Sequence, residues 1–418
     1  MVNKIYDDKK ILKDIFLGSL ELADPVKKLE KMKFDSPLGR LFFVAVGKGA
    51  GRLAKAFFRT YKGKADGIVV IPENEKCDEL DCEVIKATHP IPSQKGLDAS
   101  YKLLKAISKL GKDDLLIFCI SGGASALLPL PPEGYCLEDE IHLNKVLLGS
   151  GLSIREMNLY RGEFSQIKGG KLALTASPCP IINLVVSDIP GGDLSLVGSG
   201  PTFVPEMNRV TTSNLDFGSK INKFFSENKR KFSPLRNQDS IVLKSVCLGS
   251  SATLLDSVTE YIMKNYELNT LVLSSEFEGD AASLANFHAS ILKEIRLFDR
   301  PIKKPAIIVS SGEAHVELPK NHGRGGRNSH FALALAKEIE GVPGITALVA
   351  DTDGIDGFEK NAGAIISGET IKVLNKKAPS KDFLMDCDSF SAHKIASSLF
   401  YSGATGINLN DIRIAIVR

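Results

Sequence analysis

The sequence has no long apolar segment, no surplus of one charge and no N-terminal targeting pattern. No apolar run approaches the ~18 residues of a membrane-spanning helix, and no basic segment precedes an apolar stretch at the N-terminus. The 53 basic and 50 acidic residues nearly cancel, so charge indicates neither a nucleic-acid nor a membrane partner. We expect a cytoplasmic globular protein that binds small molecules, as a monomer or homodimer.

The cysteines also lack any recognisable framework. There are seven, an odd number, and none belongs to a C-x-x-C pair. Several lie in strand-like apolar runs such as 115–120. This pattern is typical of free thiols in a reducing compartment. The seven histidines show no metal-ligand spacing.

What the chain does contain is one repeated pattern of apolar strand, glycine-rich turn and amphipathic helix. Strands with such turns are expected at 41–46, 115–120, 181–186, 245–248, 270–273 and 306–309. Continuous apolar strands that alternate with helices indicate parallel sheets covered on both faces. The segment 313–318 looks instead like a hairpin partner, which predicts a mixed second sheet.

These patterns predict an α/β fold with two domains, which suits a chain of 418 residues. The N-terminal domain is expected to be Rossmann-like, a three-layer α/β/α arrangement around a parallel sheet. The C-terminal domain is expected to be α/β with a mixed sheet. Polar residues crowd 226–239, so we place the boundary there, with domains at 1–235 and 236–418.

Several glycine-rich loops could hold an anion. The turn 47–51 places Lys48 between two glycines after a strand, where backbone N–H groups can approach a phosphate. Its spacing matches neither the G-x-G-x-x-G dinucleotide fingerprint nor the Walker P-loop. The loop 121–125 is a second candidate, and it resembles a serine-hydrolase elbow only loosely. Lys168 beside two glycines is a third.

Acidic and cationic loops follow other strands. Asp188 follows the strand 181–186, where a carboxylate is either a helix cap or functional. Asp193, two residues beyond Gly191, could simply cap the following turn, whereas Asp188 has no equally easy structural role. The cationic loop 322–328 opens a helix, and the triple-aspartate loop 351–357 ends the next strand. Guanidinium groups and carboxylates at one sheet edge suit phosphates and divalent metal ions. They make phosphoryl transfer the leading hypothesis.

In combination these loops resemble the glycerate 2-kinase family with a MOFRL-type C-terminal domain, some members of which carry a hydroxypyruvate reductase label. The resemblance runs from about residue 41 to 416 and rests on the order of many short motifs. The matching segments are 46–49, 88–90, 121–127, 167–170, 187–188, 198–202, 325–328, 352–357 and 404–408.

The resemblance implies an active site between two α/β domains, where ATP phosphorylates D-glycerate, usually at the 2-hydroxyl, with Mg²⁺. Lys48 and Arg327 match the basic active-site positions of the family. The chain departs from the family pattern at several positions that alter its charge or shape. These positions are Ala124, Ser329, His330, Asn361 and Cys387.

We therefore predict a catalytic group and a binding group of residues. The catalytic residues are predicted to be Lys48, Arg327, Asp188 and Asp353, with Asp188 and Asp353 as candidate Mg²⁺ ligands. The substrate- and nucleotide-binding residues are predicted to be Gly122, Gly123, Ser125, Lys168, Gly169, Gly170, Ser187, Gly192, Asp193, Glu313, Asn328 and Asp356. Asp188, Asp353 and Asp356 remain alternatives for accepting the substrate hydroxyl proton.

Two other functions remain open. The strand–glycine–helix start also fits an NAD(P)H-dependent hydroxypyruvate reductase, against which the missing dinucleotide fingerprint counts. The departures at Ser329, His330 and Asn361 would fit a relative that binds ligand without catalysis. Two domains joined by a polar segment predict hinge closure on substrate.

Overall fold

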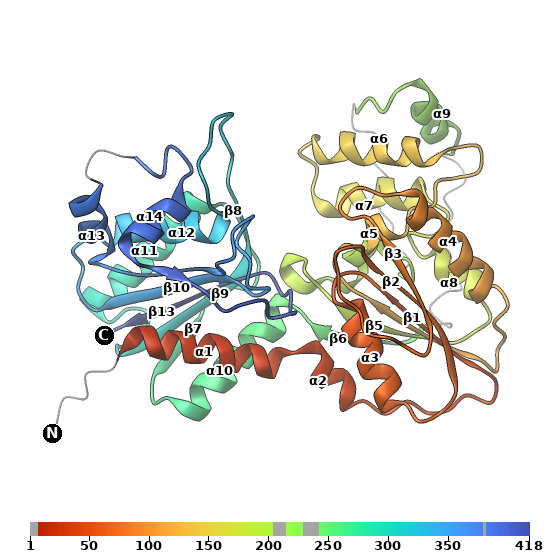
Figure 1. Ribbon diagram of the computed structural model, residues 1–418, viewed down its shortest axis with the longest axis horizontal. Coiled ribbons are helices and arrows are strands. Elements are labelled where there is room, and N and C mark those ends of the chain that lie inside the picture. Colours follow the sequence, from red (N-terminus) through yellow and green to blue (C-terminus); the bar gives the residue numbers. More distant parts are fainter. Residues whose placement is uncertain (1–6, 204–214, 229–241, 379–381) are drawn as a thin grey trace. The chain divides into compact units, whose positions relative to one another are not determined.

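The computed structural model describes residues 7–203, 215–228, 242–378 and 382–418 (Figure 1). These residues form two compact units, and the chain passes between the units more than once. The N-terminal unit comprises the described parts of Pro25–Ser187 and Asp193–Leu248. The C-terminal unit comprises the described parts of Met1–Asp24, Asp188–Gly192 and Gly249–Arg418.

This division differs from the predicted boundary after residue 235. Helix α1 (Asp8–Ala23) belongs to the C-terminal unit, because its apolar face packs on α10 (Ser251–Asn265) and on strands of the C-terminal sheet. Strand β6 (Val242–Gly249) joins the N-terminal sheet although it follows the predicted boundary. Most of the polar stretch 226–239 lies outside the described residues. Local composition cannot reveal such crossings, because the packing partner is distant in sequence.

The N-terminal unit is built on a sheet with six strands among the residues that the structure describes. In spatial order they are β3 (Glu83–Ala87), β2 (Ala65–Pro72), β1 (Leu41–Val46), β4 (Leu115–Ile120), β5 (Ile181–Val186) and β6. The pairs from β3 to β5 are parallel. The strand order reverses between β1 and β4, as in doubly wound sheets, whose ligands bind beyond the carboxyl ends of the strands at that reversal.

Helices of the N-terminal unit cover this sheet and form a smaller satellite core. They are α2 (Pro25–Glu30), α3 (Ala50–Thr60), α4 (Gln94–Ile107), α5 (Ala124–Leu127), α6 (Leu137–Leu148), α7 (Ile154–Glu163), α8 (Lys171–Ala176) and α9 (Ser219–Asn228), with a 3₁₀ segment η2 at Leu194–Ser199. Phe57 of α3 stacks on Phe43 of β1, with ring centroids 4.1 Å apart. The satellite core is formed by Leu143 and Leu147 of α6, Tyr160 of α7 and Ile221 of α9, together with Phe164 and Phe217.

The C-terminal unit is built on a mixed sheet. Its strands run in the order β12 (Leu399–Phe400), β11 (Gly363–Ser367), β10 (Ile345–Asp351), β13 (Asp411–Val417), β9 (Ala306–His315) and β7 (Asn269–Val272), with β8 (Phe277–Asp280) also on β9. β7 and β8 are parallel to β9, and the other pairs are antiparallel. The parallel N-terminal and mixed C-terminal sheets confirm the predicted α/β class.

Helices lie on both faces of the C-terminal sheet. α11 (Ala281–Phe298), α12 (Arg327–Glu338), α13 (Thr370–Lys377) and α14 (Ser389–Ala396) cover one face, and α1 and α10 cover the other (Figure 1). α12 is buried through most of its length, which explains the apolar run that follows its first turn. Throughout the described part of the chain, each helix is too short or too polar to cross a bilayer.

We predict that Phe16→Ala in α1 weakens the C-terminal unit. Phe16 is fully buried and meets Phe400 of β12 edge to face, with centroids 5.2 Å apart. Losing this ring should cost about 3–5 kcal/mol of unfolding free energy. Hydrogen exchange should accelerate in β10 and β13 while β1 and β4 stay protected.

Leu17→Ala provides the control in the same helix, because Leu17 is 51% exposed. Its effect should stay within about 0.5 kcal/mol. Selective opening of β1 and β4 by Phe16→Ala would contradict the assignment of α1 to the C-terminal unit.

Candidate functional site

Two loops meet where the strand order of the N-terminal sheet reverses. After β1, the backbone N–H of Lys48 donates to the carbonyl oxygen of Gly122 at 2.9 Å. After β4, the Ser121 hydroxyl donates to the Lys48 carbonyl oxygen at 2.8 Å. A Cβ on Gly47 would lie 2.2 Å from the Ser121 Oγ, so this approach requires glycine. The contacts hold the predicted Lys48 and Gly122 side by side at the expected ligand edge.

The ammonium group of Lys48 is exposed and uncompensated within the described residues. No carboxylate of those residues lies within 4.0 Å of it. Gly123, also predicted to bind ligand, is flanked by Lys48 and by His89. We call Lys48, His89, Ser121, Gly122 and Gly123 the Lys48 cluster. Its unpaired positive charge suits an oxyanion.

The helix N-terminus that follows Lys48 already carries a carboxylate. Gly49, the N-cap of α3, donates its backbone N–H to Glu75 Oε2 at 2.9 Å. Burial raises the pKa of Glu75, against the lowering effect of hydrogen bonds from Gly49 and Gly51. The turn 47–51 thus binds an anion of its own chain at this helix end, as the helix dipole favours.

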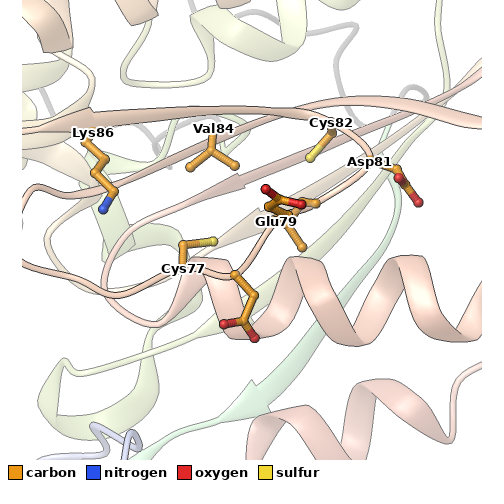
Figure 2. A pocket seen from close by; sticks show the side chains of 8 residues that line it. Cys77, Glu79, Asp81, Cys82, Val84 and Lys86 are labelled. Atoms are coloured by element: carbon orange, nitrogen blue, oxygen red, sulfur yellow. The ribbon is translucent and has the colours of Figure 1, made fainter.

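The loop beyond Glu75 lines a surface hollow that holds none of the predicted site residues (Figure 2). Its lining is Cys77, Asp78, Glu79, Leu80, Asp81, Cys82, Val84 and Lys86. Burial and neighbouring negative charge raise the pKa of both thiols, that of Cys82 to about 11. Such thiols are weak nucleophiles at neutral pH.

The predicted lysine–glycine loop 168–170 has its donors engaged inside the N-terminal unit. Lys168 is 1% exposed and forms an ion pair with Glu140 of α6, which is 2% exposed. The N–H groups of Gly169 and Gly170 donate to the carbonyl oxygens of Ser199 and Gly200, at 3.0 and 2.8 Å. This loop therefore ties the end of η2 to α6.

Two more predicted residues of the N-terminal unit join its internal hydrogen bonds. Ser125 Oγ lies 3.1 Å from Ser199 Oγ. Asp193 caps η2, where its Oδ1 accepts from the N–H and the hydroxyl of Ser195, and it pairs with Arg155. The capping role considered for Asp193 is therefore what the structure shows.

Ser187 and Asp188 follow β5, as predicted. Ser187 is fully buried and Asp188 is half-buried. Gly192 donates its N–H to the Ile189 carbonyl oxygen at 3.0 Å, which closes the turn after Asp188. The carboxylate of Asp188 thus stands at the carboxyl end of a parallel strand.

In the C-terminal unit, carboxylates gather around Arg327 at the start of α12. Its Nε donates to Asp411 Oδ1 at 3.0 Å, and its Nη2 to Asp351 Oδ2 at 3.3 Å. Its Nη1 pairs with Glu313. Strand register explains the gathering, because Asp411 of β13 lies opposite both Gly312 of β9 and Asp351 of β10. We call Glu313, Arg327, Asn328, Asp351 and Asp411 the Arg327 cluster.

Asp411 was not among the predicted residues, yet it organises this cluster. It is fully buried and also accepts from Asn328 Nδ2 at 2.7 Å, from the N–H of Ala314 at 3.2 Å and from Arg413 at 3.4 Å. Two charged residues, Asp411 and Arg413, at the start of the otherwise apolar strand 411–417 were the available signal.

Charges in the Arg327 cluster act strongly on one another. Burial lowers the pKa of Arg327, but Asp411, Glu313 and Asp351 outweigh it and raise that pKa. The pKa of Asp351 is raised well above its usual range by burial and by Asp411 and Asp353. Carboxylates outnumber guanidinium groups here, so a proton on Asp351 or a nearby cation would relieve the repulsion among them.

Asp356 has a structural partner in the same unit. Its two oxygens accept the N–H groups of Asn328 and Ser329, at 2.9 and 2.7 Å, and so cap α12. Gly326, the N-cap residue, has no side chain for this purpose, and a Cβ there would lie 2.2 Å from Asp356 Oδ1. Asp356 and Asn328 are each 1% exposed, which leaves Asp353 as the half-buried acid of this loop.

The neighbouring Arg324 differs from Arg327. It donates through Nε and Nη2 to the two oxygens of Glu359, at 2.7 and 2.8 Å, and its guanidinium lies over the Phe390 ring. Its side chain is 62% exposed. Arg327 alone of these two arginines meets the carboxylates at the strand ends.

Two of the departures from the family pattern contact each other. Asn361 Nδ2 donates to Ser329 Oγ at 3.1 Å and to the Gly363 carbonyl oxygen at 3.1 Å. His330 follows Ser329, and burial lowers the pKa of its ring more than Asp280 raises it. Ser329 and His330 belong to the first turn of α12, and the side chains of all three residues are buried.

Magnesium would have few preformed ligands. Among the described residues, no group of three or more His, Cys, Asp or Glu side chains is arranged to hold a metal ion. Mg²⁺ commonly binds through one or two carboxylates together with substrate phosphates and water. Asp188 and Asp353 are half-buried acids with oxygen donors of that kind, and their role as Mg²⁺ ligands stays a prediction.

In the N-terminal unit, a lysine without an ion-pair partner among the described residues lies where the strand order reverses. In the C-terminal unit, an arginine lies among carboxylates. These features are typical of one class of protein, the α/β phosphotransferases that act on small anionic substrates. Residues 11–220 match a domain of unknown function, DUF4147, and residues 306–411 match the MOFRL family. The chain is 33% identical over 414 residues to D-glycerate 2-kinase of Thermotoga maritima, covering 98% of each chain. It therefore belongs to the glycerate 2-kinase family, as the resemblance predicted.

Two further relatives extend this comparison. A crystal structure of glycerate kinase from Thermotoga maritima matches with a TM-score of 0.84 and 31% identity, covering 99% of this chain and 100% of that one. A protein of Agrobacterium vitis that carries a hydroxypyruvate reductase name is 32% identical over 418 residues. That match covers 98% of this chain and 94% of the relative.

We predict that Lys168→Met destabilises the N-terminal unit rather than weakening nucleotide binding. The change leaves the Glu140 carboxylate buried without its ammonium partner, which should cost about 3–5 kcal/mol in urea unfolding. Adding Glu140→Leu should recover much of this loss, because the double variant buries no charge.

The exposed Lys145→Met in α6 is the matched control and should change stability by less than about 0.5 kcal/mol. Unchanged stability with weakened ATP binding in Lys168→Met would instead support the predicted phosphate contact.

Proposed function

We propose that this protein transfers the γ-phosphoryl group of ATP to D-glycerate, at the 2-hydroxyl, giving 2-phospho-D-glycerate. The observation that carries the proposal is the Lys48 cluster, an uncompensated ammonium between glycine loops at the strand-order reversal. Relatives named glycerate kinase support the substrate class. Phosphoryl transfer depends on positioning and charge neutralisation more than on covalent chemistry, which fits such a site.

The lysine and the arginine have different tasks in this proposal. Lys48 has a positive charge that no described carboxylate neutralises, so it can bind a γ-phosphoryl oxygen or the glycerate carboxylate. Arg327 is held by three carboxylates and acts as a fixed cation with little freedom to move. A donor held in place before reaction avoids the cost of reorganisation during it.

The acids divide in a similar way. Asp356 is engaged in capping α12, and the half-buried Asp188 and Asp353 are the candidates that we propose for receiving the proton of the substrate hydroxyl. The same two carboxylates would hold Mg²⁺. The ion would neutralise charge on the phosphates of ATP.

The name of the Agrobacterium relative favours one alternative activity, that of a hydroxypyruvate reductase. Two parallel assays separate the activities: ADP release from ATP with D-glycerate, and NAD(P)H oxidation with hydroxypyruvate. NMR of the phosphorylated product identifies the hydroxyl that was modified. ATP binding in a calorimeter without turnover of D-glycerate, L-glycerate or related hydroxy acids would support a non-catalytic relative.

We predict that Lys48→Ala and Arg327→Ala each lower kcat for D-glycerate phosphorylation on the order of 10³-fold or more, because each removes a cation that stabilises the transition state. Arg324→Ala is the matched control. It removes a guanidinium from the same loop, but one that is paired with Glu359 outside the Arg327 cluster. Near-normal turnover in both alanine variants would reject the proposed roles.

We predict that Asp411→Asn lowers kcat on the order of 10²-fold, because Arg327 and Asn328 lose the anion that positions them. In a double-mutant cycle with Arg327→Ala, the losses should not add, since Asp411 acts through Arg327. Fully additive losses, in folded variants assayed well below their melting temperatures, would indicate that Asp411 only supports the fold.

A further inference from the structure

His89 lies in a turn that is anchored on both sides. The turn follows β3, which is part of the same parallel sheet as β1 and β4. The Thr88 hydroxyl donates to the Ile91 carbonyl oxygen at 2.6 Å, and the Thr88 N–H donates to Ser93 Oγ at 3.4 Å. The loop after β3 thus presents His89 at the carboxyl edge of the sheet, where ligands of doubly wound folds bind.

The imidazole of His89 and the side chain of Lys48 border the same glycine. A Cβ placed on Gly123 would lie 2.9 Å from His89 Cδ2, 3.0 Å from His89 Nε2 and 3.6 Å from Lys48 Cγ. The backbone of Gly123 has φ +82°, a left-handed conformation that glycine adopts without strain. Gly123 therefore permits a ring nitrogen and the lysine stem to approach one spot on the loop.

Neither polar group has a partner among the residues that the structure describes. The ring nitrogens of His89 form no hydrogen bond there, and the Lys48 ammonium forms no ion pair. His89 is half-buried, so its ring is partly withdrawn from water without a compensating contact from those residues. Withdrawing a polar group from water without a hydrogen-bond partner costs free energy, unless a ligand or a water molecule forms the missing bond.

The protonation state of His89 suits a donor beside a lysine. Burial lowers the pKa of His89, and the nearby positive charge of Lys48 lowers it further. At neutral pH the ring is mostly uncharged, with one N–H donor and one acceptor. Lys48 then supplies the charge at this spot, and the imidazole can supply a directional hydrogen bond.

We propose that His89 is a second oxyanion-binding residue of the Lys48 cluster, whose ring N–H donates to the oxyanion that Lys48 neutralises. The oxyanion is either the carboxylate of the hydroxy acid or a phosphate of the nucleotide. The inference rests on the proposed function for the identity of these ligands. It assigns binding to three loops of the sheet, those after β1, β3 and β4.

The test measures binding of ATP and of D-glycerate separately by calorimetry, and KM and kcat for each. His89→Ala should weaken one of the two ligands on the order of 10- to 100-fold, the usual effect of losing a hydrogen bond to a charged group. The ligand affected identifies the source of the oxyanion. His89→Gln retains an N–H donor and should recover part of the affinity.

His142→Ala is the matched control, because His142 is an exposed histidine of the same unit. Melting temperatures distinguish the loss of a contact from damage to the turn. Only damage to the turn would lower the melting temperature and reduce the ligand affinity of His89→Gln as much as that of His89→Ala. Equal loss in His89→Ala and His89→Gln, or unchanged affinity for both ligands, would overturn the inference.

Failure of the proposed function gives a different result. If the wild-type protein phosphorylates glycerate but His89→Ala binds both ligands normally, the function stands and the role of His89 falls. If no hydroxy acid is phosphorylated, the binding measurements still test the role of His89. Weaker binding of ATP or of D-glycerate by His89→Ala, with recovery in His89→Gln, would support the oxyanion contact, and unchanged binding of both ligands would reject it.

Discussion

The buried carboxylate of Asp411 is the constraint on which the C-terminal unit depends. A fully buried negative charge is stable only when donors surround it, and here the donors come from β9, β13 and the first turn of α12. The same oxygen, Oδ1, receives both Arg327 Nε and Asn328 Nδ2. One carboxylate thus fixes the entry of a buried helix relative to the ends of neighbouring strands, and with it the direction of Arg327.

The two cations of greatest interest are in opposite electrostatic situations. Arg327 lies among three carboxylates, which raise its pKa and restrict its movement. Lys48 has no such partner within the described residues, and the helix end beside it is already occupied by Glu75. A compensated cation is suited to fixing geometry, and an uncompensated one is suited to binding an incoming oxyanion. Each unit by itself contributes one of these elements.

The departures from the family pattern also have a physical interpretation. Asn361 donates its amide N–H to the hydroxyl oxygen of Ser329 in the first turn of α12. Both side chains are fully buried, so a lone change at either position would remove the partner of a buried polar group. Ser329 also donates its backbone N–H to Asp356, so the pair adjoins the cap of the helix that carries Arg327.

The sequence by itself determined the α/β class, the parallel and mixed character of the two sheets, the family, and the loops after β1, β4 and β10. These features follow from apolar runs, glycine turns and motif order, which are local. Only the tertiary structure decided which side chains in those loops are engaged internally. Lys168 looked like a phosphate ligand and is buried against Glu140, and Asp356 caps a helix that begins almost thirty residues earlier in the chain. The sequence analysis did not predict Asp411, and its domain boundary assigned α1 to the N-terminal and β6 to the C-terminal domain, the reverse of what the structure shows. The reason is that strand register and packing bring together residues that are distant in sequence.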